Sequence, residues 1–234
     1  MTDTESRVGR EIIRADVLGE VPHGFFTGVG HEGPPDPETI LGGSRLVLVN
    51  QVHSPDALSV TRPFPPDSLP DADALATATP GLALGIRTAD CAPVLLADKA
   101  AGVVGAAHAG WRGAHFGVLE AVVRRMEELG AQRGNIHAAI GPTIAPANYE
   151  VGWDFCEQFE DRHRRFFTRG KPGKWHFDLP AYAKWRLESL KLAGVQMIGR
   201  DTYADERRFH SYRRATHRGE PGDRRQYSLI ANIR

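Results

Sequence analysis

Three residues in separate parts of the chain could together bind a metal ion. His53 follows an apolar run, Cys91 lies in the polar turn Thr88-Ala89-Asp90-Cys91, and His108 ends another apolar run. Two imidazoles and one thiolate suit zinc, and three protein ligands leave a fourth position open, as in catalytic zinc sites. Copper also accepts such ligands. The residue types therefore indicate a candidate Zn²⁺ site, with Cu²⁺ as the alternative metal.

The spacing of these residues is not that of a compact zinc motif, because they lie far apart in the chain. From residue types and spacing alone, the plainer interpretation is preferred: Cys91 is an inert buried thiol, and both histidines are ordinary core or surface groups. The other histidines are weaker candidates. His115 is expected to face solvent one turn into a helix, and His163 is expected at the surface among arginines.

Charged residues near these three add candidates for catalysis and for anion binding. Asp90 could orient a ligand or carry a proton, although a turn-stabilising aspartate explains it equally well. Arg112 precedes a predicted helix whose first N–H groups could hold phosphate. Arg213 and Arg214 belong to an arginine-rich stretch at 203–225 that could fold over the site and contact a phosphate or nucleoside. A solvated loop is the alternative for that stretch.

The elements that must position these residues are short strands and about three helices. Apolar runs bounded by turn residues predict buried strands at 44–50, 82–87, 93–97, 103–108, 136–141, 195–199 and 227–233. Apolar residues at helical spacing predict helices at 113–129, 151–167 and 180–192. Two proline-rich stretches, 28–43 and 62–80, are expected to be irregular. The pattern predicts an α/β or α+β fold, in a single domain over 1–234.

Composition excludes several classes of function. The 234 residues carry 29 basic and 29 acidic side chains, a balance that argues against a nucleic-acid or anionic-membrane partner. Two cysteines cannot form a disulfide framework. No apolar stretch is long enough to span a membrane, and the polar N-terminus is not a signal peptide. We therefore expect a cytoplasmic location.

Six motifs in order resemble the YfiH family of laccase-domain proteins. They are NQVHS at 50–54, DADAL at 71–75, RTADCAPVLLAD at 87–98, AAHAGWRG at 106–113, AIGPTI at 139–144 and SYRR at 211–214. This family was formerly described as multicopper polyphenol oxidases. It is now described as purine nucleoside phosphorylases with adenosine deaminase activity. The resemblance covers about residues 45–234.

The resemblance changes the preferred interpretation of the three candidate ligands. It implies a metal site at His53, Cys91 and His108, and a four-layer α-β-β-α arrangement with two sheets between helices. It also implies phosphorolysis of adenosine, inosine and S-methyl-5′-thioadenosine, with phosphate as co-substrate, and deamination of adenosine. We therefore expect a transferase and hydrolase in which Cys91, His108 and Asp90 are catalytic. Substrate and phosphate would contact Arg112, Arg213 and Arg214.

The chain also departs from the family pattern. Residues 23–28 read HGFFTG, so Gly28 stands where the family has arginine, and the segment before Ser44 is short and proline-rich. These changes keep open a non-catalytic metal-binding or interaction module. Two further alternatives are a hydrolase with Cys91 as nucleophile and His108 as base, and a copper-dependent phenol oxidase.

Overall fold

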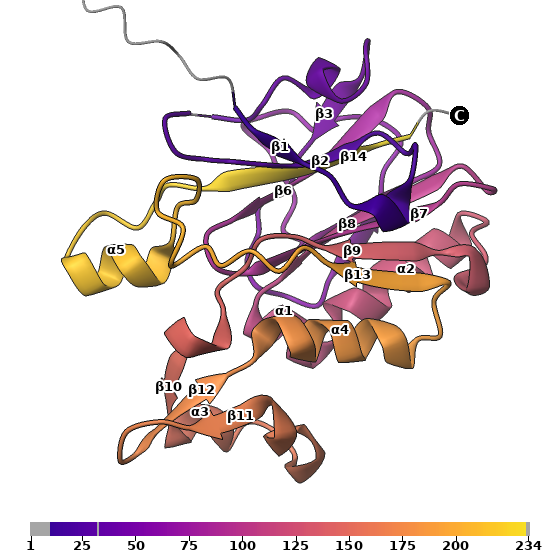
Figure 1. The fold of residues 1–234 in the computed structure, drawn as a ribbon. Helices are drawn as coiled ribbons and strands as arrows, with labels where there is room; N and C mark the ends of the chain where they lie inside the picture. The colour runs from indigo at the N-terminus through magenta and orange to yellow at the C-terminus, as the bar shows by residue number, and fades with distance from the viewer. Residues whose placement is uncertain (1–9, 32, 233–234) are drawn as a thin grey trace, which may run out of the picture.

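Two stacked β-sheets run through the computed structural model, which describes residues 10–31 and 33–232 (Figure 1). The five-stranded sheet has the order β1-β2-β14-β6-β3. Its strands are β1 (Ile12–Ile13), β2 (His23–Phe26), β3 (Arg45–Val47), β6 (Leu82–Thr88) and β14 (Gln226–Ala231). The six-stranded sheet has the order β13-β9-β7-β8-β5-β4. Its strands are β4 (Ala57–Ser59), β5 (Ala74–Thr77), β7 (Ala92–Asp98), β8 (Val103–Ala109), β9 (His137–Ile140) and β13 (Gly194–Met197).

The two sheets bury a common apolar layer between them. Side chains alternate across a strand, so Leu84 and Ile86 of β6 pack toward Leu95 of β7 in this layer. Val94 and Leu96 of β7 point the other way, into a second core cluster. Every residue of β7 is buried, which explains why its sequence is a continuous apolar run rather than an alternating one.

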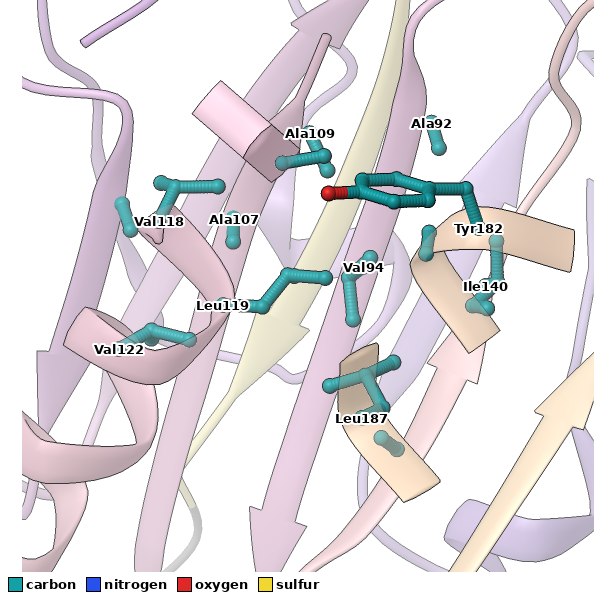
Figure 2. Close-up of a cluster of buried hydrophobic side chains, with 14 of the residues drawn as sticks. Ala92, Val94, Ala107, Ala109, Val118, Leu119, Val122, Ile140, Tyr182 and Leu187 are labelled. Carbon is teal, nitrogen blue, oxygen red and sulfur yellow. The ribbon is translucent and has the colours of Figure 1, made fainter. Parts of the chain in front are cut away.

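The helices α1 (Trp111–Phe116), α2 (Val118–Glu128) and α4 (Leu179–Ser189) cover the outer face of the six-stranded sheet. The other α-helices of the described residues are α3 (Trp153–Cys156) and α5 (Tyr212–Arg218). Figure 2 shows Leu119 and Val122 of α2 and Tyr182 of α4 packed over Val94 and Ala107 of the sheet. This packing fixes α1, which begins two residues after the end of β8 at Ala109.

A third, smaller sheet lies apart from the two large ones, at the bottom of Figure 1. Its strands are β10 (Glu150–Gly152), β11 (Phe167–Arg169) and β12 (Lys174–Phe177), in the order β10-β12-β11. Aromatic side chains connect it to the helices, since Phe177 and Tyr182 rings lie 5.6 Å apart. The segment 150–177, which contains this sheet and is called the insertion below, packs against α1 and α4.

The predicted mixed α/β single domain with two facing sheets is confirmed. The four-layer arrangement implied by the resemblance differs from the structure, because in the described residues α-helices pack on the six-stranded sheet and not on the five-stranded one. The predicted helix at 180–192 is α4, and the one at 113–129 is divided into α1 and α2 by Gly117, whose φ is 106°. Among the described residues, no helix is long and apolar enough to cross a membrane. Ile233, the end of the last predicted strand, and residues 1–9 lie outside the described residues.

Two predictions about local structure were wrong. The segment 151–167 is not one helix but contains β10, the short α3 and a 3₁₀ helix at Asp161–Phe166. Its aromatic residues are not confined to one helical face, because Trp153 is exposed while Phe159 is buried against several rings. The stretch 62–80 is not wholly irregular, because it contains the fully buried strand β5.

Candidate metal site and adjoining cavity

His53, Cys91 and His108 meet at one end of the two sheets. β7 and β8 are antiparallel neighbours in which Ala92 pairs with Ala109 and Pro93 with His108, so Cys91 lies beside His108. His53 reaches the same point from the loop that follows β3. One ligand atom from each of the three residues lies within 4.8 Å of the others. The His53 and His108 rings are 4.7 Å apart.

Asp73, immediately before β5, holds both histidines in position. Its Oδ1 lies 2.6 Å from Nδ1 of His108, and its Oδ2 accepts hydrogen bonds from the amides of Val52 (3.1 Å) and Ser54 (2.6 Å). The Asp73 side chain is fully buried. One carboxylate therefore orients the His108 ring and fixes the backbone on both sides of His53, the kind of support that metal-binding histidines usually have.

The loop that carries His53 is tied to both sheets. His53 has a φ of 61°, a left-handed conformation that is uncommon for residues other than glycine and is often found at functional sites. On the side of the five-stranded sheet, Gln51 accepts a hydrogen bond from the Arg87 amide (2.9 Å) and donates one to the Arg87 carbonyl (2.7 Å). With Asp73 on the other side, these bonds hold His53 in its unusual conformation.

The space between the ligand atoms depends on a glycine. Gly110, which precedes α1, has its backbone against the site. A Cβ at this position would lie 2.9 Å from Cδ2 of His53 and 3.0 Å from Sγ of Cys91. Both distances are shorter than ordinary van der Waals contacts, so even a methyl group would push these side chains.

The electrostatics of the site favour the charged thiolate. Burial acts to raise the pKa of Cys91, but His108 and His53 outweigh it and lower that pKa to about 6. Burial acts to lower the pKa of His108, but the Cys91 thiolate and the Asp73 carboxylate raise it to about 9. The thiolate is the form that binds metals, and a cation would replace the proton on His108.

The donor set fits a metal ion. His108 uses Nδ1 toward Asp73, which leaves Nε2 for a ligand bond, while Nε2 of His53 lies 3.8 Å from Sγ of Cys91. Two nitrogens and one sulfur leave one position of a tetrahedral ion open. Among residues 10–31 and 33–232, this is the one group of three or more His, Cys, Asp or Glu side chains placed to share an ion.

Both carboxylate oxygens of Asp90, which is adjacent to Cys91, accept hydrogen bonds from other segments of the chain. Its Oδ1 accepts a hydrogen bond from the Thr202 hydroxyl (2.7 Å), and its Oδ2 accepts bonds from the Ser211 hydroxyl (2.9 Å) and the Arg213 amide (2.7 Å). The φ of Asp90 is 82°. The carboxylate therefore attaches the start of α5 to the turn that carries Cys91, which is a positioning role.

The three arginines proposed as anion contacts differ in their surroundings. Arg112 is exposed, stacks 5.3 Å from the Trp111 ring and lines the cavity beside the metal donors. Arg213 also lines this cavity, donating to the Glu150 carbonyl. Arg214 instead donates to three backbone carbonyls, those of Thr202, Tyr203 and Phe209. Arg214 thus holds the loop before α5 and lies outside this cavity.

The cavity beside the donors has a volume of about 780 Å³. Besides the ligands and the two arginines, it is lined by the aromatic and cationic side chains of Trp111, Tyr149, Tyr212, Arg87 and Arg225. Tyr212 and Arg225 belong to the stretch 203–225 that was predicted to fold over the site, whereas Arg87, Trp111 and Tyr149 were given no role there. The guanidinium of Arg213 lies 5.2 Å from the Tyr149 ring. The aromatic part of the lining suits a flat heterocycle, and the arginines suit an anion.

Two other sequence expectations about histidines need correction. His163 was expected at the surface, but only 2% of it is exposed, because it packs among Tyr182 and Trp185. His115 was expected to face solvent, but it is half-buried, and its Nδ1 lies 3.3 Å from the Tyr182 hydroxyl. Both belong to the aromatic packing between the insertion and α4.

Comparison with known proteins places this geometry in a family. A family model described as multi-copper polyphenol oxidoreductase laccase matches residues 38–231. A protein of Deinococcus radiodurans named purine nucleoside phosphorylase is 42% identical, with 88% of each chain covered. One of Corynebacterium glutamicum with the same description is 35% identical, covering 91% of this chain and 92% of that protein.

Solved structures share the fold. A Neisseria meningitidis protein described as DUF152 is 28% identical, with a TM-score of 0.79 over 96% of this chain and 99% of that one. The Bacillus licheniformis hypothetical protein YfiH is 24% identical, with a TM-score of 0.80 over 96% of this chain and 97% of that one. The expected resemblance to YfiH proteins is therefore confirmed.

Proposed function

Since the chain belongs to the multi-copper polyphenol oxidoreductase laccase family, we propose that it is a metal-dependent purine nucleoside phosphorylase. The name of its Deinococcus and Corynebacterium relatives supports this activity. The observation that carries the proposal is the His53, Cys91 and His108 donor set at the wall of a cavity that also presents aromatic rings and arginines. Zn²⁺ suits these donors best, and Cu²⁺ is the alternative.

In the proposed reaction, a phosphate oxygen attacks C1′ of the ribose and the bond from C1′ to the purine nitrogen breaks. The purine leaves with the electron pair of that bond and takes up the proton that hydrogen phosphate releases as it becomes the ribose 1-phosphate ester. The rings of Trp111 and Tyr149 would contact the purine, and Arg112 and Arg213 would hold phosphate and offset its charge. When bound, a metal ion would supply Lewis-acid stabilisation of developing negative charge.

The substrates we propose are adenosine, inosine and S-methyl-5′-thioadenosine. Deamination of adenosine is a second candidate activity, in which water adds to C6 and ammonia leaves. The observation in its favour is the nitrogen and sulfur donor set with an open position, which resembles the sites of zinc deaminases. Asp90 and Asp223 are the two carboxylates that line the cavity, and we propose that proton transfer in this reaction falls to one of them.

A product analysis tests these proposals. Zinc-loaded protein is incubated with adenosine, with and without phosphate, and the products are separated by chromatography. Adenine formed only with phosphate supports phosphorolysis, whereas inosine formed in both incubations supports deamination. If metal-loaded protein forms neither product, both activities are wrong and the non-catalytic binding module becomes the better account. Turnover that depends on copper and dioxygen with a phenol would instead favour the oxidase.

A further inference from the structure

A second cavity adjoins the one beside the metal donors. Its volume is about 1230 Å³. The two cavities share four lining residues, Arg87, Tyr212, Asp223 and Arg225. The two cavities therefore meet at these four residues, and a group attached to a ligand in the metal cavity would reach the second cavity past them.

The first cavity already has the capacity for a nucleoside. Cavities that hold small molecules typically measure roughly 300–1,000 Å³, and the metal cavity of about 780 Å³ lies within this range. The second cavity is thus not needed to hold a purine and its ribose. The residues that line the second cavity therefore indicate which chemical group, attached to the nucleoside, it could bind.

The charges of the second cavity favour an anion. Four arginines line it and only two carboxylates, which are Glu220 and Asp223. The Arg224 side chain is exposed, and its guanidinium makes no hydrogen bond or ion pair with another described residue. Arg225 uses Nη1 for the nearby carbonyls of Gly222 and Arg224, and Arg87 uses Nη2 for that of Val49. Each of these guanidinium groups keeps other N–H donors for a ligand.

The glycine that departs from the family pattern lies against this cavity. A Cβ at Gly28 would be 2.6 Å from Cδ2 of His210, whose side chain lines the second cavity. The His210 backbone is fixed by Gln226, which accepts a bond from its amide (2.9 Å) and donates one to its carbonyl (3.2 Å). A side chain at residue 28 would therefore displace the imidazole and alter the wall of the cavity.

We infer that the substrate is a purine nucleoside carrying an anionic extension, such as a 5′-phosphate, which the second cavity binds. The inference rests on the proposed function and deepens it. The nucleoside lies beside the metal donors, and Arg87 and Arg225 contact the extension where the cavities join. Arg224 then neutralises the outer part of the anion.

The test compares adenosine with adenosine 5′-monophosphate as substrates of the zinc-loaded protein at saturating phosphate. We expect kcat/KM for the monophosphate to exceed that for adenosine by about tenfold, the effect of roughly one charge-assisted contact. Arg224→Glu should remove this preference, with less than about a twofold change for adenosine, because the contact is electrostatic. The matched control is Arg207→Glu, an exposed arginine that lines neither cavity.

The outcomes separate this inference from the proposed function. If adenosine is cleaved and the monophosphate is not preferred, or if both variants behave alike, the inference is wrong and the proposed function stands. If neither compound is cleaved, the proposed function fails, and calorimetric titration then decides the inference. Tighter binding of the monophosphate than of adenosine, lost in Arg224→Glu alone, would support it, and equal or absent binding would overturn it.

Discussion

Two regions of the site are built in different ways. In the metal corner, formed by His53, Cys91, His108 and Asp73, Cys91 and His108 lie at the ends of neighbouring strands, and the loop that carries His53 is fixed by the fully buried carboxylate of Asp73. The arginine wall, formed by Arg112, Arg213 and Arg225, lies on loops, the start of α1 and the seven-residue helix α5. The comparison indicates that strand pairing and the buried Asp73 carboxylate fix the geometry of the metal corner, whereas the substrate contacts come from loops and short helices.

Each region depends on one aspartate that uses both of its oxygens. Asp73 connects the His53 loop to His108, and Asp90 connects α5 to the turn before Cys91. The same residue type thus supports two different properties. Removing Asp73 should affect metal binding, while removing Asp90 should affect substrate binding, and the predictions below test that division.

The largest effect is expected for Cys91→Ala. This variant loses one of three metal donors, so we expect no stoichiometric zinc and no measurable turnover, with the fold retained. Zinc content by mass spectrometry, turnover and circular dichroism check this. Cys156→Ala is the control, because Cys156 is a buried core thiol away from the cavity. Zinc and turnover retained in Cys91→Ala would mean that the ligand assignment is wrong.

Asp73→Asn should give the next largest effect. The amide must place an NH₂ group against either the His108 ring or the two backbone amides, leaving buried donors without acceptors. We expect zinc affinity to fall about 10–100-fold and stability to fall by about 1–3 kcal/mol. Zinc titration and urea unfolding measure both. Asp67→Asn, in an exposed loop, is the control, and equal behaviour of the two variants would refute the role of Asp73.

Gly110→Ala tests the space at the metal corner with a single methyl group. The backbone of Gly110 has φ −64° and ψ 165°, which alanine adopts without strain. We therefore expect zinc affinity to fall about tenfold through crowding of His53 and Cys91, with stability lowered by about 1–3 kcal/mol. The control is Gly134→Ala, since a Cβ at Gly134 meets nothing within 4 Å. Unchanged zinc affinity in Gly110→Ala would show that the metal corner binds zinc even when the His53 and Cys91 side chains are displaced.

Asp90→Asn should have the smallest effect on metal binding and act on the arginine wall. Loss of the carboxylate weakens its bonds to Ser211 and to the Arg213 amide, so α5 is held less firmly. We expect KM for phosphate to rise severalfold while zinc content stays at the wild-type level. Steady-state kinetics at varied phosphate measure this. Loss of zinc in this variant would contradict the division between the two regions.

The same contrast explains how much could be predicted from sequence. The strands that carry Cys91 and His108 are continuous apolar runs, so their extents and the mixed α/β fold could be predicted. The convergence of His53 with them was not visible in spacing and followed only from the family resemblance. The role of Asp73 was missed because a proline-rich neighbourhood indicated an irregular loop, whereas tertiary pairing of β5 with β8 places it opposite His108.

The arginine-rich stretch was the least predictable region. Sequence alone could not distinguish Arg213, which lines the cavity, from Arg214, which donates to backbone carbonyls. The two residues are adjacent and chemically identical. The direction of each side chain depends on where α5 begins, which the sequence alone does not show. Arg225 could likewise not be told apart from the other arginines of the stretch 203–225, and Arg87 gave no separate signal because it lies within the strand β6.

X-ray absorption at the zinc edge of the loaded protein tests the central claim, a single open metal site at the metal corner, most directly. We predict two nitrogen ligands at about 2.0–2.1 Å, one sulfur at about 2.3 Å and one light atom in the fourth position. We also predict that the sulfur signal disappears in any zinc that Cys91→Ala retains. A site with only oxygen ligands, or a sulfur signal unchanged in Cys91→Ala, would contradict it.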